Sequence, residues 1–141
     1  MKKLITESLD SDCVVLTCDG FTIDGNPGLG GYIITNLEGE ILKKDDSEHE
    51  HSNNYFELLG IWYSIKYAID NYEDKVRIYT DSATCLAWIK NGKCSEETSE
   101  HDVVMKIIAL IKASLVTNSD IELTKWVTSE RGEIPADPSR K

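Results

Sequence analysis

The chain has 141 residues, a formal net charge of −10 and four cysteines. This length fits one domain, and such a domain buries about two-thirds of the surface that its unfolded chain exposes. No stretch is long and apolar enough for a transmembrane helix, and the start of the chain lacks the apolar segment of a secretion signal. We therefore expect a soluble protein that is neither inserted in a membrane nor exported by a cleaved signal.

The cysteines indicate a reducing environment. Their spacing fits neither a C-x-x-C motif nor a zinc site, and we interpret them as free thiols rather than as disulfide partners. They are Cys13, Cys18, Cys85 and Cys94. This interpretation predicts a cytoplasmic location, because disulfides are rare there.

The acidic balance argues at first against a nucleic-acid partner, because duplex binding draws on Lys and Arg contacts to phosphates. Much of the acidity is local, however, in the stretches Glu38–Glu50 and Glu96–Asp102. The three histidines lie in or beside these stretches and are interpreted as solvated; they are His49, His51 and His101. Carboxylates that bind cations would also lose their charge, so we expect weak nucleic-acid binding without metal.

The first half of the predicted sheet consists of antiparallel strands. The apolar, β-branched run Val14–Cys18 predicts a strand whose C-terminal end delivers the carboxylate of Asp19. Turn-forming residues follow from Asp24 to Gly28, and the runs Tyr32–Thr35 and Ile41–Leu42 predict a hairpin. Three antiparallel strands are expected here.

The second half alternates helices and strands. Apolar residues at three- and four-residue steps predict a helix over Asn54–Asn71, and a strand over Val76–Asp81 follows. A short helix over about Ser82–Lys90, a longer one over about Ser99–Ser114 and a last strand over Ile121–Val127 complete the chain. This order predicts a mixed α/β fold with at least one parallel strand pair.

Three acidic residues stand where these elements would bring them together. Asp19 and Asp81 each end a predicted strand, and Glu57 lies near the start of the long helix. Carboxylates crowded in this way must raise a pKa or bind a cation. Oxygen ligands without His or Cys favour a hard ion such as Mg²⁺ or Mn²⁺.

Each of these residues also has a purely structural interpretation. Asn54-x-x-Glu57 has the form of a helix capping box, in which Asn54 is the N-cap and Glu57 reaches back to it. Asp81 before Ser82 fits a plain helix cap, and Asp19 before a glycine fits a plain turn. Taken singly these alternatives are common, and only the joint occurrence of the residues favours a site.

Several short motifs follow one another in order along the chain. They are Asp19-Gly20, Gly25-Asn26-Pro27-Gly28 with Gly30-Gly31, Asn53-Asn54-x-x-Glu57, and Tyr79-Thr80-Asp81-Ser82. Together they resemble type 1 ribonuclease H, from about residue 13 to residue 141. The closing segment, with Trp126, Gly132-Glu133-Ile134-Pro135-Ala136-Asp137 and a final Arg140-Lys141, resembles the end of a compact bacterial subgroup.

This resemblance implies a fold and an activity. The implied fold is α/β and ribonuclease H-like, with a mixed five-stranded sheet of three antiparallel strands followed by parallel ones, flanked by helices. The implied activity is endonucleolytic hydrolysis of the RNA strand of an RNA–DNA hybrid, leaving 5′-phosphate and 3′-hydroxyl ends. The implied cofactor is two Mg²⁺ or Mn²⁺ ions per site. A monomer with one catalytic domain over residues 1–141, and no N-terminal hybrid-binding domain, is expected.

The resemblance also assigns roles to the acidic residues. Asp19 is expected to contact both ions, Asp137 the ion that activates water, and Glu57 with Asp81 the ion that faces the leaving oxygen. Many relatives have a histidine in the loop before the last aspartate, and this sequence has none there. Glu133 takes that place as an auxiliary carboxylate. Asp137 lies four residues from the last residue, so its position must depend on a short tail.

Contacts to both strands of a hybrid are implied in the same way. The backbone from Gly20 to Gly25 is expected to face RNA 2′-hydroxyls, and Asn26 with Asn53 is expected to contact the minor groove. The implied pocket for a DNA phosphate consists of Ser52, Asn54 and Thr128, with Ser95, and Trp88 is expected to pack on a deoxyribose. Ala83 departs from the family pattern, because many relatives have a glutamine there that reaches the groove.

Two alternative functions stay open at this point. The first is a non-catalytic module that keeps the fold for nucleic-acid binding or protein contact. The second is a nuclease of the same superfamily that acts on DNA. The presence of all four acidic residues argues against the first, because a module without catalysis has no need of a full ligand set.

Overall fold

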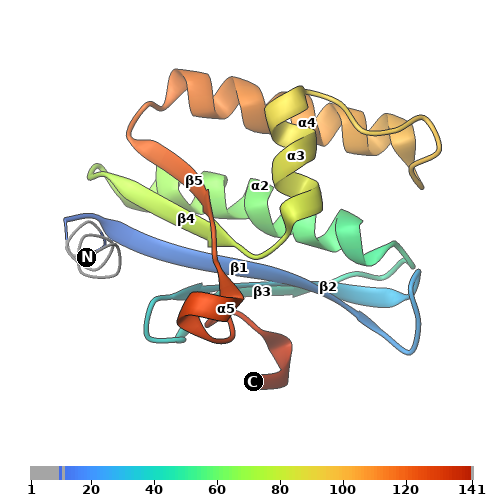
Figure 1. Ribbon diagram of the computed structural model, residues 1–141, viewed down its shortest axis with the longest axis horizontal. Coiled ribbons are helices and arrows are strands. Elements are labelled where there is room, and N and C mark those ends of the chain that lie inside the picture. Colours follow the sequence, from blue (N-terminus) through green and yellow to red (C-terminus); the bar gives the residue numbers. More distant parts are fainter. Residues whose placement is uncertain (1–9, 11, 141) are drawn as a thin grey trace.

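The computed structural model describes residue 10 and residues 12–140 of the chain (Figure 1). The strands are β1 (Val14–Ile23), β2 (Leu29–Asn36), β3 (Ile41–Asp46), β4 (Val76–Thr80) and β5 (Ile121–Lys125). The helices are α2 (Asn53–Asn71), α3 (Ala83–Asn91), α4 (His101–Thr117), α5 (Thr128–Arg131) and the 3₁₀ turn η1 (Pro138–Arg140). Among these residues no helix combines the length and apolarity that crossing a membrane requires.

The strands form one mixed sheet in the order β3-β2-β1-β4-β5. The pairs β1–β2 and β2–β3 are antiparallel, and the pairs β1–β4 and β4–β5 are parallel. The predicted sheet of three antiparallel strands followed by parallel ones is therefore confirmed.

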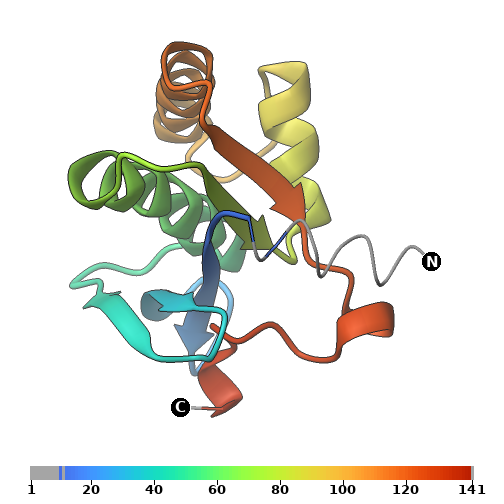
Figure 2. The same ribbon diagram turned by 90° about the vertical axis from the view of Figure 1, so that its left-hand side faces the viewer.

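The two faces of the sheet are covered differently. Helices α2 and α4 lie on one side, and α5 lies on the other (Figure 2). The main core lies on the α2 side. Most apolar residues of the predicted face are buried, namely Phe56, Leu58, Ile61, Ile65 and Ala68, whereas Leu59 and Trp62 are half-buried and Ile69 is 43% exposed. A smaller apolar cluster on the α5 side consists of Val15, Tyr79, Trp126 and Ile134.

The parallel register between β1 and β4 decides where two of the acidic residues lie. Cys18 opposite Thr80 is the last paired position, so Asp19 and Asp81 are the next residues on neighbouring strands. The prediction that β1 ends near Asp19 is wrong, because β1 continues to Ile23. Antiparallel pairing with β2 supports β1 over these extra residues, after β4 has turned away.

Other boundaries differ from the predicted ones by a few residues. Helix α4 begins two residues late, at His101, and follows Glu100 in a left-handed conformation with φ 59°. The last strand ends at Lys125, and α5 was not predicted, because four residues are too few to show a helical period. Gly92 ends α3 in a left-handed conformation with φ 74°, as its place after the helix predicted.

Helix α2 approaches β1 so closely at Gly20 that no side chain fits between them. A Cβ atom on Gly20 would lie 2.3 Å from the backbone nitrogen of Glu57 and 2.4 Å from the backbone carbon of Phe56. Real Cβ atoms do not come this near to backbone atoms. The glycine therefore allows α2 to carry Glu57 to the strand that carries Asp19.

Substitution Gly20→Ala should destabilise the protein, because α2 must move away from β1 to make room for the methyl group. Overpacking of this kind costs on the order of 2 kcal/mol in the free energy of unfolding, which urea denaturation measures. Gly60→Ala in α2 is the matched control, since its Cβ would be in ordinary contact with Tyr32 at 3.4 Å. An equal loss of stability in both variants would contradict the close approach at Gly20.

Candidate functional site

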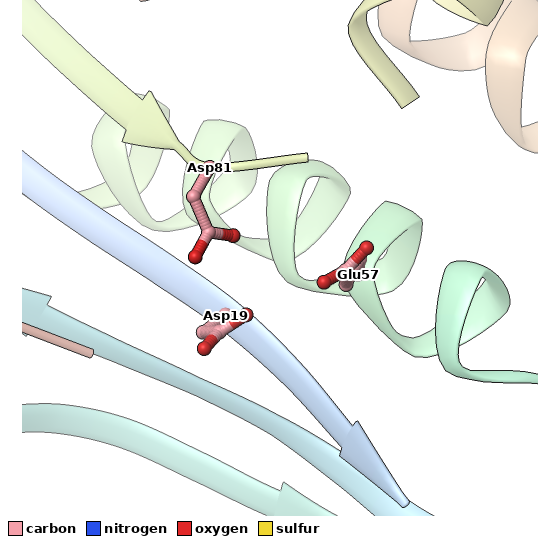
Figure 3. Close-up of side chains that lie close together, drawn as sticks. All are labelled: Asp19, Glu57 and Asp81. Atoms are coloured by element: carbon pink, nitrogen blue, oxygen red, sulfur yellow. The ribbon is translucent and has the colours of Figure 1, made fainter. Parts of the chain in front are cut away.

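Three carboxylates from three different elements meet at one edge of the sheet. Asp19 lies on β1, Glu57 on α2, and Asp81 directly after β4. One carboxylate oxygen from each residue lies within 4.8 Å of those of the other two. All three residues are half-buried, and their side chains face a common space (Figure 3).

Neighbouring polar groups hold these carboxylates. The backbone N–H of Gly20 donates to Oδ1 of Asp19 at 3.0 Å. Glu57 accepts hydrogen bonds from the side-chain amide of Asn53, at 3.5 Å, and from the hydroxyl of Ser82. Asp19 and Glu57 thus accept hydrogen bonds from protein groups, and Asp81 directly follows the end of β4.

The structural interpretations of these motifs are wrong in their details. Ser52, not Asn54, is the N-cap of α2, and its hydroxyl accepts from the N–H of Tyr55 at 3.1 Å. Ser82, not Asp81, is the N-cap of α3, and its hydroxyl accepts from the N–H of Cys85 at 3.1 Å. Because Ser52 and Ser82 cap the two helices, the carboxylates of Glu57 and Asp81 are not needed as caps.

Burial and mutual repulsion disfavour the ionised forms of the three carboxylates. Burial and the charges of Asp81, Glu57 and Asp137 raise the pKa of Asp19 from 3.8 to about 8. Burial and the charge of Asp81 raise the pKa of Glu57 from 4.5 to about 7, against the hydrogen bonds that it accepts. Burial also raises the pKa of Asp81, and Asp137 adds to this effect while Lys125 opposes it. Such a cluster favours a proton or a cation.

The donor set fits a hard divalent cation. The three groups offer only carboxylate oxygens, which are ligands of Mg²⁺ and Mn²⁺ rather than of soft metals. Within residue 10 and residues 12–140, no other group of three or more acidic, histidine or cysteine residues has ligand atoms this close together.

Asp137 lies near the three carboxylates without being part of their close group. Its charge raises the pKa of both Asp19 and Asp81. Its Oδ1 accepts from the N–H and from the hydroxyl of Ser139, each at 2.9 Å, where η1 begins. Glu133 is exposed in the segment between α5 and the buried Ile134.

The structure brings some of the predicted substrate contacts together at the start of α2. The N–H of Asn53 donates to the side-chain oxygen of Asn26 at 2.8 Å, which ties α2 to the β1–β2 loop. Gly25 precedes Asn26 and has a φ of 145°, and Ser52 precedes Asn53. Asn53 also donates to Glu57 at 3.5 Å, so the contact between Asn53 and Asn26 lies next to the acidic site.

The predicted phosphate pocket is not assembled by direct bonds. Ser95 is exposed between α3 and α4, and its hydroxyl accepts from the N–H of Glu97 at 3.2 Å. Thr128 is exposed at the start of α5. Among the described residues no hydrogen bond links either of them to Ser52 or Asn54, so this pocket stays a prediction. Trp88 on α3 is half-buried against the main core.

Some functional candidates were missed in the sequence. Lys125 ends β5 opposite Thr80 and lowers the pKa of the adjacent Asp81, and the matching strand ends of β4 and β5 were its only sequence signal. The interpretation of His51 as solvated is wrong. Its Nδ1 lies 2.7 Å from both carboxylate oxygens of Glu100, a contact between residues 49 positions apart.

Comparisons with known proteins agree with this fold. The sequence matches the family described as RNase H over residues 11–136. Ribonuclease H1 from Halobacterium salinarum is 17% identical, with 87% of this chain and 92% of that one covered and a TM-score of 0.63. LC11-RNase H1, isolated from compost, is 15% identical, with coverage of 92% and 99% and a TM-score of 0.61.

A third solved structure is the N-terminal RNase H domain of a Mycobacterium tuberculosis protein. It is 20% identical, with 84% of this chain and 89% of that one covered and a TM-score of 0.59. LC11-RNase H1 has also been solved in complex with an RNA/DNA hybrid. The fold is thus that of the ribonuclease H-like class. The chain belongs to the RNase H family of hydrolases, as its motifs predicted.

Without metal, the protein should lose stability as the pH rises from about 4 to about 8. Over this interval the folded protein holds protons on Asp19 and Glu57 that the unfolded chain releases, because the folded pKa values are about 8 and about 7. In EDTA, Asp19→Asn should therefore melt higher than wild type at pH 8. A relief of about 1 kcal/mol corresponds to roughly 4 °C for a domain of this size.

At pH 4 the difference between the two proteins should vanish, since both carboxyl groups are then protonated. Glu96→Gln, which removes an exposed carboxylate between α3 and α4, is the control and should follow the wild-type profile. A wild-type melting temperature that does not fall between pH 5 and pH 8 would show that the acidic group carries no repulsive strain.

Proposed function

We propose that the protein is an endonuclease that hydrolyses the RNA strand of RNA–DNA hybrids and leaves 5′-phosphate and 3′-hydroxyl ends. The observation that carries this proposal is the meeting of Asp19, Glu57 and Asp81 from β1, α2 and the end of β4. Membership of the RNase H family supports the reaction class. We also propose that it acts as a monomer with one catalytic domain in the cytoplasm.

The proposed cofactor is a pair of Mg²⁺ or Mn²⁺ ions held by Asp19, Glu57, Asp81 and Asp137. Such ions lower the pKa of a bound water and stabilise the attacking and leaving oxygens of an in-line displacement. The negative charges of Asp81, Glu57 and Asp137 all raise the pKa of Asp19, so Asp19 is close enough to interact with each of them. This is consistent with its proposed contact to both ions.

The remaining protein groups have supporting parts in this proposal. Glu133 is proposed as an auxiliary carboxylate, and its exposure before the buried Ile134 supports this role. The amide of Asn53 and the hydroxyl of Ser82 orient Glu57, which limits the geometries that its carboxylate can take. In this proposal neither Asn53 nor Ser82 is itself a metal ligand.

The proposed substrate is supported by the RNA/DNA hybrid in the complex of LC11-RNase H1. Hybrid specificity has a physical basis, because 2′-hydroxyls mark one strand and deoxyribose geometry marks the other. The backbone from Gly20 to Gly25, with Asn26 and Asn53, is proposed to contact the groove beside the scissile bond. Trp88 is proposed to pack on a deoxyribose. The proposed DNA-phosphate contacts are Ser52, Asn54, Ser95 and Thr128.

Wild-type protein should cleave a labelled RNA–DNA hybrid in Mg²⁺ or Mn²⁺, and Asp81→Asn should lower the rate by about 100-fold or more, because a ligand is lost. Asp102→Asn removes one exposed carboxylate and is the matched control. Gel analysis of end-labelled strands gives both the rate and the product ends. Undiminished cleavage by Asp81→Asn, or none by wild type in either metal, would refute the nuclease proposal.

Duplex RNA, duplex DNA and the hybrid, offered in parallel, separate the proposed activity from its alternatives. Only the RNA strand of the hybrid should be cut. Cleavage of duplex DNA would instead indicate a superfamily nuclease that acts on DNA, and binding of the hybrid without any cleavage would indicate a non-catalytic module.

Hybrid binding should be weak, because a chain of net charge −10 repels phosphates, and sensitive to salt, because its contacts with phosphates are electrostatic. The Asp81→Asn variant allows equilibrium binding in Mg²⁺ to be measured by fluorescence anisotropy. Its affinity should fall roughly tenfold or more between about 50 and 200 mM monovalent salt. A dissociation constant that stays constant over this range would contradict the prediction.

A further inference from the structure

A buried ion network lies on the sheet face opposite α2. The carboxylate of Asp10 accepts on Oδ1 from a guanidinium nitrogen of Arg77 and from the hydroxyl of Tyr79, each at 2.7 Å. Its Oδ2 accepts from Arg131 at 3.0 Å. Asp10 is 7% exposed. One carboxylate therefore joins β4, which carries Arg77 and Tyr79, to α5, which ends at Arg131.

The hydrogen bonds outweigh the cost of burying this carboxylate. Burial by itself raises the pKa of Asp10, but the bonds from Tyr79, Arg77 and Arg131 lower it, and the net pKa is below its ordinary value. A buried charge is costly when it loses its partners. Asp10 is thus bound to Arg131 and β4 as one unit.

The guanidinium of Arg131 is fixed on its other sides by aromatic rings. Its central carbon lies 4.1 Å from the ring centroid of Trp126 and 4.9 Å from that of Tyr79. The indole N–H of Trp126 donates to the carbonyl of Gly132 at 2.8 Å. The residue that follows Arg131 is therefore held as well.

The chain from Gly132 leads in five residues to Asp137. Ile134, in the middle of this stretch, is fully buried and packs with Val15, Tyr79 and Trp126. Ala136 is also fully buried. The segment that carries Glu133 and Asp137 is thus fastened at Arg131, at Gly132 and at Ile134, and Asp137 lies directly beyond the last buried residue.

We infer that Asp10 is a positioning residue for the metal centre. Through Arg131 it fixes the start of the C-terminal segment, and thereby the place of Asp137 beside Asp19 and Asp81. The inference rests on the proposed function, because it takes Asp137 as a metal ligand. Removing one partner of a buried ion pair also destabilises a protein, so Mg²⁺ binding is compared among variants that fold.

The test is Mg²⁺ binding to metal-free protein, measured by calorimetry, together with hydrogen exchange of the backbone. Asp10→Asn should weaken Mg²⁺ binding by about tenfold, as loss of a supporting contact does at metal sites. Exchange should become faster in residues 126–139 and stay unchanged in α2. Glu122→Gln is the matched control, since Glu122 contacts Arg77 at 3.4 Å and is half-exposed, and in the described part of the chain its hydrogen bonds and ion pairs are to Arg77 rather than to Arg131. It should bind Mg²⁺ like wild type.

Arg131→Lys is the second variant in case Asp10→Asn does not fold. It keeps the positive charge but loses the planar group that stacks on Trp126, and it should weaken Mg²⁺ binding in the same direction. Wild-type affinity in a folded Asp10→Asn or Arg131→Lys protein would overturn the inference.

A double-mutant cycle separates positioning from a general loss of stability. In an Asp137→Asn background the Asp10→Asn change should have no further effect on Mg²⁺ affinity, because the ligand that it positions is already gone. Additive effects would overturn the inference. Absence of Mg²⁺ binding in the wild type would instead refute the proposed function, which is a different and separately visible result.

Discussion

Repulsion among Asp19, Glu57 and Asp81 is the constraint that the rest of the structure must overcome. Burial and mutual charge raise the pKa of all three groups, so the folded protein without a cation disfavours their ionised forms. Their closeness is imposed by backbone geometry: the parallel register places Asp19 beside Asp81, and Gly20 lets α2 bring Glu57 against β1. The buried core between α2 and the sheet supplies the free energy that holds this arrangement. The proposed active site thus lowers the stability of the fold.

The two faces of the sheet position different parts of the site. On one face, nonpolar packing of α2 fixes Glu57 relative to the strands. On the other face, a charged network around Asp10 and a small apolar cluster around Trp126 fix the segment that ends in Asp137. Apolar contacts tolerate small displacements, whereas hydrogen bonds to a planar guanidinium fix direction as well as distance. A short segment without a long helix of its own gains orientation from such contacts.

Local patterns were enough to predict the acidic trio and most strands and helices, because strand ends and helical periods depend on neighbouring residues, whereas the five-stranded mixed sheet was implied by the family resemblance. Asp81 follows five apolar or β-rich positions, and Glu57 lies in a clear helical period. The roles of Ser52 and Ser82 were not predictable, because several polar residues at each helix start compete for the cap. The contact between Asp10 and Arg131 joins residues 121 positions apart, and that between His51 and Glu100 joins residues 49 positions apart. Local sequence patterns cannot predict contacts over such distances. Family resemblance predicted the importance of Asp137 but not how its segment is held.

The hydrogen bonds at Asp137 link the tail to the state of the site. The N–H and hydroxyl of Ser139 both donate to Oδ1 of Asp137, so a cation that takes this oxygen competes with two protein donors. Asp137 also raises the pKa of Asp19 and Asp81, so its charge disfavours the ionised site until a cation is present. The two effects at Asp137 oppose each other. Repulsion from the other carboxylates favours binding of a cation, whereas the hydrogen bonds from Ser139 compete with the cation for Oδ1 of Asp137. In the positioning that we infer, the Asp10 network sets this balance, because it holds the segment that carries Asp137.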